Sequence, residues 1–479
     1  MKKACLILMI ITVIAVMGFS LIGCNNKEET NDNLCYDIKI NLTENKLTGE
    51  QTVSYNNVYC ENLTESVFHL YPNAYAENAK NKAYVIEPSV YGGIEVTSVK
   101  SGENNVEYTI SECGEYLTVK HGEVKKNDNI SLKIEYSVTL PSCNLRLGYV
   151  DGYYNLSGFY PQLSVYGENG FRQDAYSAVG DPILSTVATY NVEFDCDKSL
   201  VVASSLKCKD ISTTTNRQLL KYSGENVRDF AFACNSNYNV INGQAGGVNV
   251  YYFYTADENA QETLNTTIKA INTFSEAFGA YPYDTYSVAR VPFDCDGMEY
   301  SGLVYVAEKC SDLTEAVIHE TAHQWWYGMV GNDCINESYM DEGLVTFCSA
   351  YYYELNGESE KFKEKINAIK RAYINYENLQ KRRNTGMNLA MDKPIYEYTD
   401  YQYTMVIYYK GSMMFNNLYE LYGKEKFNMC MKKYCDKYKF KIAGKEQFTE
   451  TAEGVLGNIS GLIEGWLGEK IVATTFAEK

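Results

Sequence analysis

The stretch His319-Glu320-Thr321-Ala322-His323 is followed, nineteen residues after its second histidine, by Glu342. On an α-helix a four-residue step brings both imidazoles onto one face, where they can share a metal ion, and the intervening Glu320 projects beside them. Histidine is scarce in this chain, with four in 479 residues. The pattern therefore predicts a helix that binds one Zn²⁺ through His319 and His323, with Glu342 supplied by a second helix as the third ligand.

This set of residues has the chemistry of a hydrolytic zinc site. Catalytic zinc centres use three protein ligands and keep a fourth position for water, whose pKa falls to about 7. Glu320 then has the role of general base toward the zinc-bound water as that water attacks a carbonyl. The residues alone predict metal-assisted hydrolysis.

Five motifs resemble those of the gluzincin metallopeptidases, and among them the aminopeptidase N family. The spacing from His319 to Glu342 is similar to that family's HExxH-x18-E. Its H-x-W-F-G resembles His323-Gln324-Trp325-Trp326-Tyr327-Gly328, its N-E-G resembles Asp341-Glu342-Gly343, its G-A-M-E-N resembles Asp296-Gly297-Met298-Glu299-Tyr300, and its Y-E-K-G resembles Tyr408-Tyr409-Lys410-Gly411. The resemblance implies an N-terminal β domain, a thermolysin-like catalytic domain and an aminopeptidase activity, and it ends near Trp466.

Two flanking motifs supply candidate substrate contacts. A fixed carboxylate can recognise a free α-ammonium by a charge-assisted hydrogen bond that an internal peptide cannot make, and Glu299, with Gly297 and Met298 beside it, is the candidate. Tyr408 is the candidate donor to the developing oxyanion, with Tyr409 and Tyr403 as alternatives.

The chain departs from the family pattern around the expected amine site. Tyr300 stands where the family has asparagine and Asp296 where it has glycine. These changes weaken the expectation of strict aminopeptidase specificity. The glutamine that family members supply from the N-terminal domain has no assigned counterpart, although Gln162 and Gln173 lie in the right region.

The N-terminus predicts export and lipidation. Residues 1–23 combine a basic start, an apolar run and a small residue before Cys24, which is typical of a lipoprotein signal peptide, and residues 24–34 are expected to form a flexible tether. The alternative is an uncleaved membrane anchor. Loss of Lys2 and Lys3 would change the formal net charge from −18 to −20. Such a polyanion argues against nucleic-acid binding and for membrane attachment through lipid at Cys24, outside the cytoplasm.

The rest of the chain predicts an α+β protein with two domains. Residues 35–250 alternate polar and apolar side chains, as in Ile130-Ser131-Leu132-Lys133-Ile134, which is typical of an antiparallel β domain. Residues 251–479 predict a mostly helical zinc-peptidase domain, beginning with a helix over 264–278 that Gly279 ends. We further expect a loop region over 148–181, and helix N-caps at Ser311 and Asn336. The cysteine spacings predict no zinc ribbon, and thiol pairing stays open.

Three functions are compatible with these features. The first is a zinc aminopeptidase that acts on peptides outside the cytoplasm, and the second is a zinc endopeptidase or specialised peptidase without a strict free-amine requirement. The third is a surface lipoprotein that binds ligands on a peptidase scaffold without turnover, although a binder has no need of Glu320. Side-chain preference, oligomeric state and physiological substrate are left open.

Overall fold

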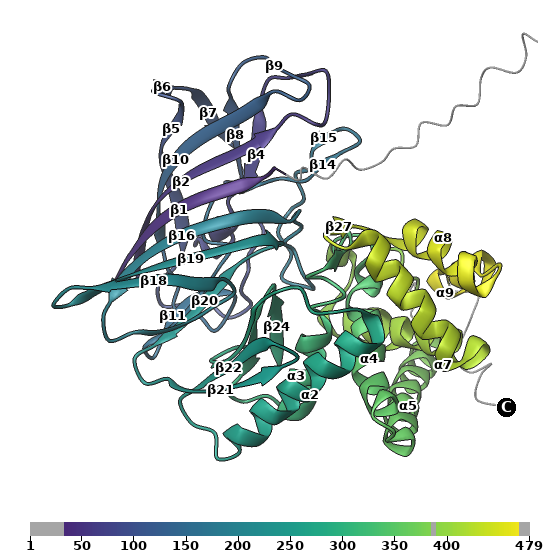
Figure 1. Cartoon of the computed structure of the whole chain (residues 1–479). Coiled ribbons are helices and arrows are strands. Elements are labelled where there is room, and N and C mark those ends of the chain that lie inside the picture. The colour runs from purple at the N-terminus through teal and green to yellow at the C-terminus, as the bar shows by residue number, and fades with distance from the viewer. Residues whose placement is uncertain (1–32, 385–388, 469–479) are drawn as a thin grey trace, which may run out of the picture.

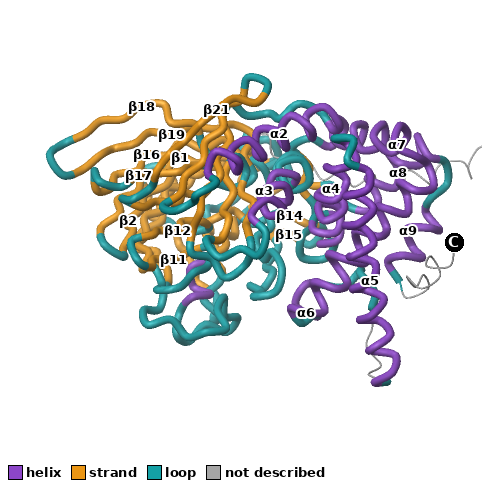
Figure 2. Tube along the Cα trace, turned by 90° about the horizontal axis from the view of Figure 1, so that it is seen from below, coloured by secondary structure: helices purple, strands orange, loops and turns teal. Residues whose placement is uncertain are grey.

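The computed structural model describes residues 33–384 and 389–468. Strands dominate the N-terminal part and helices the C-terminal part, and the two parts lie side by side (Figures 1 and 2). This arrangement confirms the predicted fold class. The predicted signal peptide, Cys24 and most of the predicted tether lie outside the described residues. Within the described part of the chain, none of the helices combines the length and apolarity needed to cross a bilayer.

An eight-stranded sheet forms the main layer of the N-terminal part. The alternation predicted for residues 130–138 is present, because Ile130, Leu132 and Ile134 are buried while the residues between them are not. The neighbouring strands are antiparallel except for one parallel pair, β1 with β16, so the sheet is mixed rather than purely antiparallel. Its strand order is β18 (Lys207–Thr213), β19 (Arg217–Val227), β16 (Ala188–Asp197), β1 (Cys35–Thr43), β2 (Lys46–Asn56), β10 (Asn129–Thr139), β5 (Gly93–Ser101) and β6 (Asn104–Asn105).

Smaller sheets complete the N-terminal part. The prediction of a loop over residues 148–181 is wrong in part, since Tyr153–Ser157 forms a fully buried strand. Its tyrosine-rich sequence has no period of two because both faces are covered. The sheets are β11 (Leu147–Val150), β12 (Tyr153–Ser157), β20 (Ala231–Asn235) and β17 (Val201–Ser204); β13 (Gln162–Leu163), β4 (Ser66–His69), β8 (Tyr116–Lys120) and β7 (Glu107–Ile110); β14 (Tyr166–Gly167) with β15 (Gly170–Phe171); and β3 (Asn62–Leu63) with β9 (Val124–Lys125).

The C-terminal part joins a five-stranded sheet to a group of helices. The predicted helix over 264–278 is present as α2 (Ala260–Phe278), which ends at Gly279 with φ +121°. The sheet order is β21 (Asn239–Ala245), β22 (Val248–Tyr254), β23 (Thr285–Val291), β25 (Leu303–Ala307) and β24 (Gly297–Tyr300). Residues 250 and 251, the predicted domain boundary, both lie within β22, and the five-stranded sheet begins at β21. The division of the chain into two domains stays a prediction.

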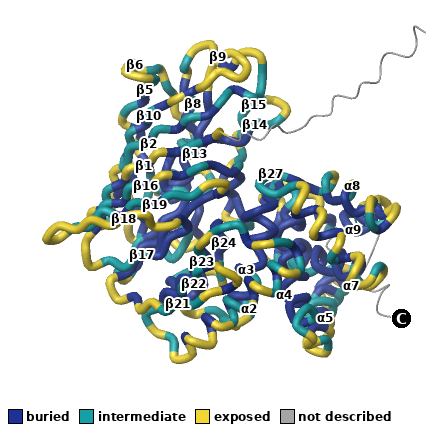
Figure 3. The backbone as a smooth tube through the Cα atoms, in the orientation of Figure 1, coloured by how far each residue is buried: buried dark blue, intermediate teal, exposed yellow. Residues whose placement is uncertain are grey.

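The other helices follow the sheet and bury a large aromatic core. They are α3 (Leu313–Ala322), η2 (Ser338–Met340), α4 (Glu342–Leu355), α5 (Ser359–Arg383), η3 (Ile395–Glu397), α6 (Asp400–Tyr403), the π-helix η4 (Thr404–Lys410), α7 (Gly411–Tyr438), α8 (Lys445–Leu456) and α9 (Ser460–Leu467). A short parallel pair, β26 (Val330–Gly331) with β27 (Lys441–Ile442), lies among them. Figure 3 shows that buried residues concentrate where these helices meet the sheet. All cysteines among the described residues are free thiols.

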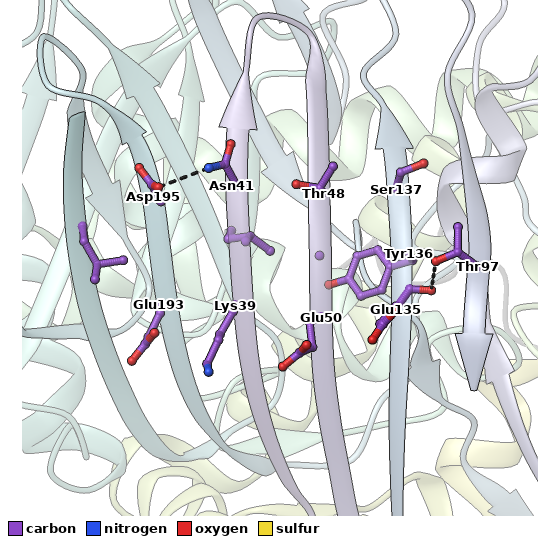
Figure 4. Close-up of a pocket in the computed structure, with 13 residues that line it drawn as sticks. Lys39, Asn41, Thr48, Glu50, Thr97, Glu135, Tyr136, Ser137, Glu193 and Asp195 are labelled. Carbon is purple, nitrogen blue, oxygen red and sulfur yellow. Dashed lines mark hydrogen bonds between the residues drawn. The ribbon is translucent and has the colours of Figure 1, made fainter. Parts of the chain in front are cut away.

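An open groove of about 550 Å³ crosses the eight-stranded sheet (Figure 4). Side chains from neighbouring strands line it, including Glu50, Glu135, Glu193, Asp195 and one lysine, Lys39. It belongs to the N-terminal sheet, whereas the predicted metal ligands lie on α3 and α4. The groove is therefore separate from the predicted chemistry.

Candidate metal centre

Helix α3 presents the two histidines. Asp312 caps its N-terminus by accepting a hydrogen bond from the Glu315 backbone N–H at 3.2 Å. The predicted cap, Ser311, instead donates through its hydroxyl to Asp296. Regular helix ends at Ala322, but His323 keeps right-handed helical angles. The two rings therefore face the same side, with their Nε2 atoms 3.2 Å apart.

Glu342 completes a three-donor cluster at the start of α4. Its Oε2 lies 3.3 Å from Nε2 of His319 and 3.3 Å from Nε2 of His323. The predicted cap at Asn336 is wrong, because the short helix η2 intervenes and α4 begins only at Glu342. Donors about 2.0–2.1 Å from one tetrahedral zinc ion lie roughly 3.3–3.4 Å from one another. The observed spacings fit a single Zn²⁺ bound by His319, His323 and Glu342.

Neighbouring polar groups orient both imidazoles. Nδ1 of His323 lies 2.8 Å from an Asp341 carboxylate oxygen, and both side chains are 1% exposed. Nδ1 of His319 lies 3.3 Å from the Ser349 hydroxyl. These contacts hold the Nδ1 side of each ring and direct Nε2 toward the metal. Sequence reasoning quoted Asp341 only as part of a motif and missed Ser349, which lies about two turns further along α4.

Glu320 lies against the backbone of β24. A Cβ on Gly297 would come within 2.3 Å of Glu320 Oε1, so only glycine leaves room for the carboxylate. Glu320 is buried, and its Oε2 has no hydrogen-bond partner among the described residues. Burial raises the pKa of this carboxyl to about 8, against the opposing effect of His323. A carboxylate with a raised pKa and a free oxygen is suited to accept a proton from water.

Two motif glycines bring Tyr408 to the metal ligands. A Cβ on Gly343 would come within 2.9 Å of the Gly411 Cα, so α4 and α7 meet backbone to backbone. Tyr408, on η4, donates a hydrogen bond of 2.6 Å to Glu342 Oε1, and its ring stacks on that of His319. Of the two alternatives, Tyr403 packs its ring edge-on against Tyr408, and Tyr409 packs against the helical core. The geometry favours Tyr408.

On strand β24, the side chain of Glu299 lies on one face and those of its neighbours Met298 and Tyr300 lie on the other. Side chains alternate across a strand, and Met298 and Tyr300 pack together in a buried cluster on the face opposite Glu299. The Tyr300 hydroxyl donates to Ser157 Oγ at 2.9 Å and its ring packs on Tyr305. The departure at Tyr300 is thus accommodated in packing between the two parts of the chain. Met298 packs in the same cluster, and its Sδ accepts a hydrogen bond from Arg146.

Glu299 itself faces the metal ligands. It is 3% exposed, and its Oε1 has no hydrogen-bond partner among the residues the structure describes. Burial, followed by the charge of nearby Asp181, raises the pKa of its carboxyl. Gln162 is buried on β13 and Gln173 is exposed. Sequence reasoning missed Asp181, whose carboxylate lies within 4.8 Å of those of Glu299 and Glu342.

Several of the known proteins and families that match this chain agree with this geometry. Residues 262–466 match the family described as "Peptidase family M1 domain". The chain is 23% identical over 405 residues to aminopeptidase N of Lactobacillus delbrueckii subsp. lactis, covering 78% of this chain and 46% of that protein. A crystal structure of an M1 zinc metallopeptidase from Deinococcus radiodurans matches with a TM-score of 0.66 at 16% identity, over 93% of this chain and 95% of that one.

These matches show which fold the chain shares with known proteins and how much of their length it covers. The structural match shows the same two-part fold. Aminopeptidase 2 of Candida albicans is 29% identical over 140 residues, which are 26% of this chain and 14% of that protein. The chain thus spans less than half the length of these curated relatives. Residues 262–466 match the peptidase family M1 domain, and the His-His-Glu cluster within them suits one zinc ion.

Proposed function

We propose that this chain, whose residues 262–466 match the peptidase family M1 domain, is a zinc aminopeptidase that hydrolyses the N-terminal peptide bond of peptides. The observation that carries the proposal is the joint geometry of two sites. The donors of His319, His323 and Glu342 lie within 3.3 Å of one another. The buried carboxylate of Glu299 lies within 4.8 Å of Glu342 and has an oxygen without a partner among the described residues.

Each side chain of the site has a separate task in this reaction. Zinc held by the three ligands supplies a Lewis acid that polarises the scissile carbonyl and acidifies water. Glu299 binds the free α-ammonium of the substrate and so sets the distance from the chain end to the reacting bond. Glu320 accepts the proton of the attacking water and delivers it to the leaving amine. The Tyr408 hydroxyl, which in this structure donates to Glu342, donates instead to the developing oxyanion.

Catalysis is tested by Glu320→Gln, with Glu377→Gln as the matched control. Glu377 is also a buried glutamate, but it lies on α5 and pairs with Lys381. We expect Glu320→Gln to bind one zinc per chain, measured by elemental analysis, and to lose hydrolysis of aminoacyl p-nitroanilides by at least about 100-fold. Glu377→Gln should retain activity. Equal activity in wild type and Glu320→Gln would refute the assigned base, and an inactive wild type that binds zinc would favour the non-catalytic binding protein.

The free-amine requirement separates an aminopeptidase from an endopeptidase. Burial of Glu299 favours the aminopeptidase, since an unpaired buried carboxylate is costly until a cation reaches it. N-acetylation of the substrate should therefore abolish turnover by the wild type. Glu299→Ala should weaken binding of free-amine substrates while leaving the zinc content unchanged. Retained turnover of acetylated peptides would favour an endopeptidase.

We also propose that the protein is exported and anchored to the membrane by lipid at Cys24. The support is the sequence alone: the apolar run of residues 1–23 and the Leu21-Ile22-Gly23-Cys24 ending. Mass spectrometry of the membrane fraction should find a diacylated N-terminal Cys24, and Cys24→Ser should release the protein from that fraction. An unmodified Cys24 in a membrane-bound chain would support the uncleaved anchor.

A further inference from the structure

The structure brings a third carboxylate, that of Asp181, next to Glu299 and Glu342. Asp181 belongs to the segment that connects β15 to β16, and it is 5% exposed. Oxygens of Asp181, Glu299 and Glu342 all lie within 4.8 Å of one another. The N-terminal part of the chain thereby contributes a charged group to the site on the C-terminal part.

Arg146 and Gly180 fix the position of Asp181. The Arg146 guanidinium donates to the Asp181 carboxylate and to Met298 Sδ, and also to the Gly180 carbonyl at 3.3 Å. Gly180 has a φ of +70°, and a Cβ there would come within 2.8 Å of the Tyr403 hydroxyl. Only glycine tolerates both conditions. The segment is therefore held between Tyr403 and Arg146, and the carboxylate next to it has little freedom to move.

The side chains around this group balance its charge only in part, although a His323 ring nitrogen lies within 4.8 Å of a Glu299 oxygen. Glu342 is a zinc ligand and Asp181 pairs with Arg146, but Glu299 Oε1 has no partner among the described residues. Two buried carboxylates this close repel each other unless a cation lies between them. An ammonium group fits this requirement because it carries one charge and three N–H donors, which can reach several oxygens at once.

We propose that Asp181 is a specificity-determining residue whose carboxylate, held by Arg146, is the second anionic partner of the substrate α-ammonium that Glu299 binds. This inference rests on the proposed aminopeptidase function and adds a residue to it. A second divalent cation bound by the same three carboxylates is the competing interpretation. The ammonium is favoured because one carboxylate already holds a guanidinium and another is needed by zinc.

The test measures recognition of the amine without turnover. Zinc-loaded Glu320→Gln protein is titrated calorimetrically with leucinamide and with 4-methylpentanamide, which lacks only the amine. In this background we expect Asp181→Asn to weaken leucinamide binding by about 10- to 100-fold, the range for a lost charge-assisted hydrogen bond, and to leave 4-methylpentanamide binding unchanged. Asp181→Glu, which keeps the charge but moves it, should cause a smaller loss.

Asp174→Asn is the matched control. Asp174 lies on the same connecting segment and pairs with Arg172 instead. It should leave leucinamide binding unchanged. Thermal unfolding and zinc content of each variant separate loss of fold or metal from loss of recognition.

The outcomes are distinguishable. Unchanged leucinamide affinity in a folded Asp181→Asn protein would overturn the inference and leave the proposed function standing. A second metal equivalent in the wild type that Asp181→Asn loses would overturn it in favour of the cation site. Asp181-dependent binding of leucinamide to a protein whose wild type hydrolyses no aminoacyl amide would support the ammonium site while refuting the peptidase activity.

Discussion

Gly297→Ala is expected to disable Glu320 without harming the fold. The added Cβ would lie 2.3 Å from Glu320 Oε1, 2.6 Å from its Cδ and 2.7 Å from its Cγ. The carboxylate must retreat by about 1 Å to reach an ordinary van der Waals separation. A misplacement of about 1 Å in a catalytic group costs on the order of 100-fold in rate. Gly297 has no left-handed φ, so alanine fits its backbone and removes freedom from the unfolded chain, which stabilises by up to about 1 kcal/mol.

The assay is kcat for leucine p-nitroanilide, with zinc content and the melting temperature measured on the same preparation. We expect kcat to fall about 100-fold, with one zinc per chain and a melting temperature equal to or slightly above that of the wild type. Gly454→Ala is the control, because a Cβ at Gly454 meets nothing within 4 Å. Wild-type kcat in a folded Gly297→Ala protein would refute the argument that β24 holds the base in place.

Three further predictions concern Tyr408, Asp341 and His69. Tyr408→Phe should lower kcat by about 10²- to 10³-fold with zinc retained; a loss below tenfold would move the oxyanion role to another donor. Asp341→Ala should weaken zinc binding by about 10- to 100-fold in a chelator competition, because it removes the carboxylate next to His323 Nδ1. Unchanged zinc affinity would show that this carboxylate does not orient the ring. Burial, followed by the charge of Arg172, lowers the pKa of His69 to about 3. Below pH 6.5 the His69 imidazole is therefore protonated in the unfolded state but stays neutral in the folded state. This difference should lower the free energy of unfolding by about 2 kcal/mol as the pH falls from 6.5 to 5. Urea unfolding of wild type and His69→Phe at both pH values checks this, and parallel pH profiles would contradict it.

The sequence predicted the local parts of the site well. The two histidines and Glu320 lie on one helix, so their relative placement follows from helical geometry alone. The helix over 264–278 and the alternation of β10 were likewise readable from short-range periodicity. Glu342 and Tyr408 needed motif spacing, because the contact between α4 and η4 joins residues 66 apart in the chain.

What the sequence did not predict depends on tertiary contacts. Asp181 and Arg146 carry no local signal, since their meeting with Met298 requires both parts of the chain to be folded. The helix caps were misplaced by one residue at α3 and by five at α4, where η2 intervenes. Buried strands such as β12 have no period of two, so a tyrosine-rich segment was taken for a loop.

The contact between Gly343 and Gly411 couples the position of the metal ligand Glu342 to that of the Tyr408 hydroxyl. Because the two backbones touch, a shift of α4 along α7 would change the distance between Glu342 and the Tyr408 hydroxyl. A bulkier residue at either glycine would push the two helices apart. It would weaken zinc binding and displace the Tyr408 hydroxyl at the same time. Substitutions meant to change zinc binding without changing the position of the Tyr408 hydroxyl should therefore avoid this helix crossing and target the surroundings of His319.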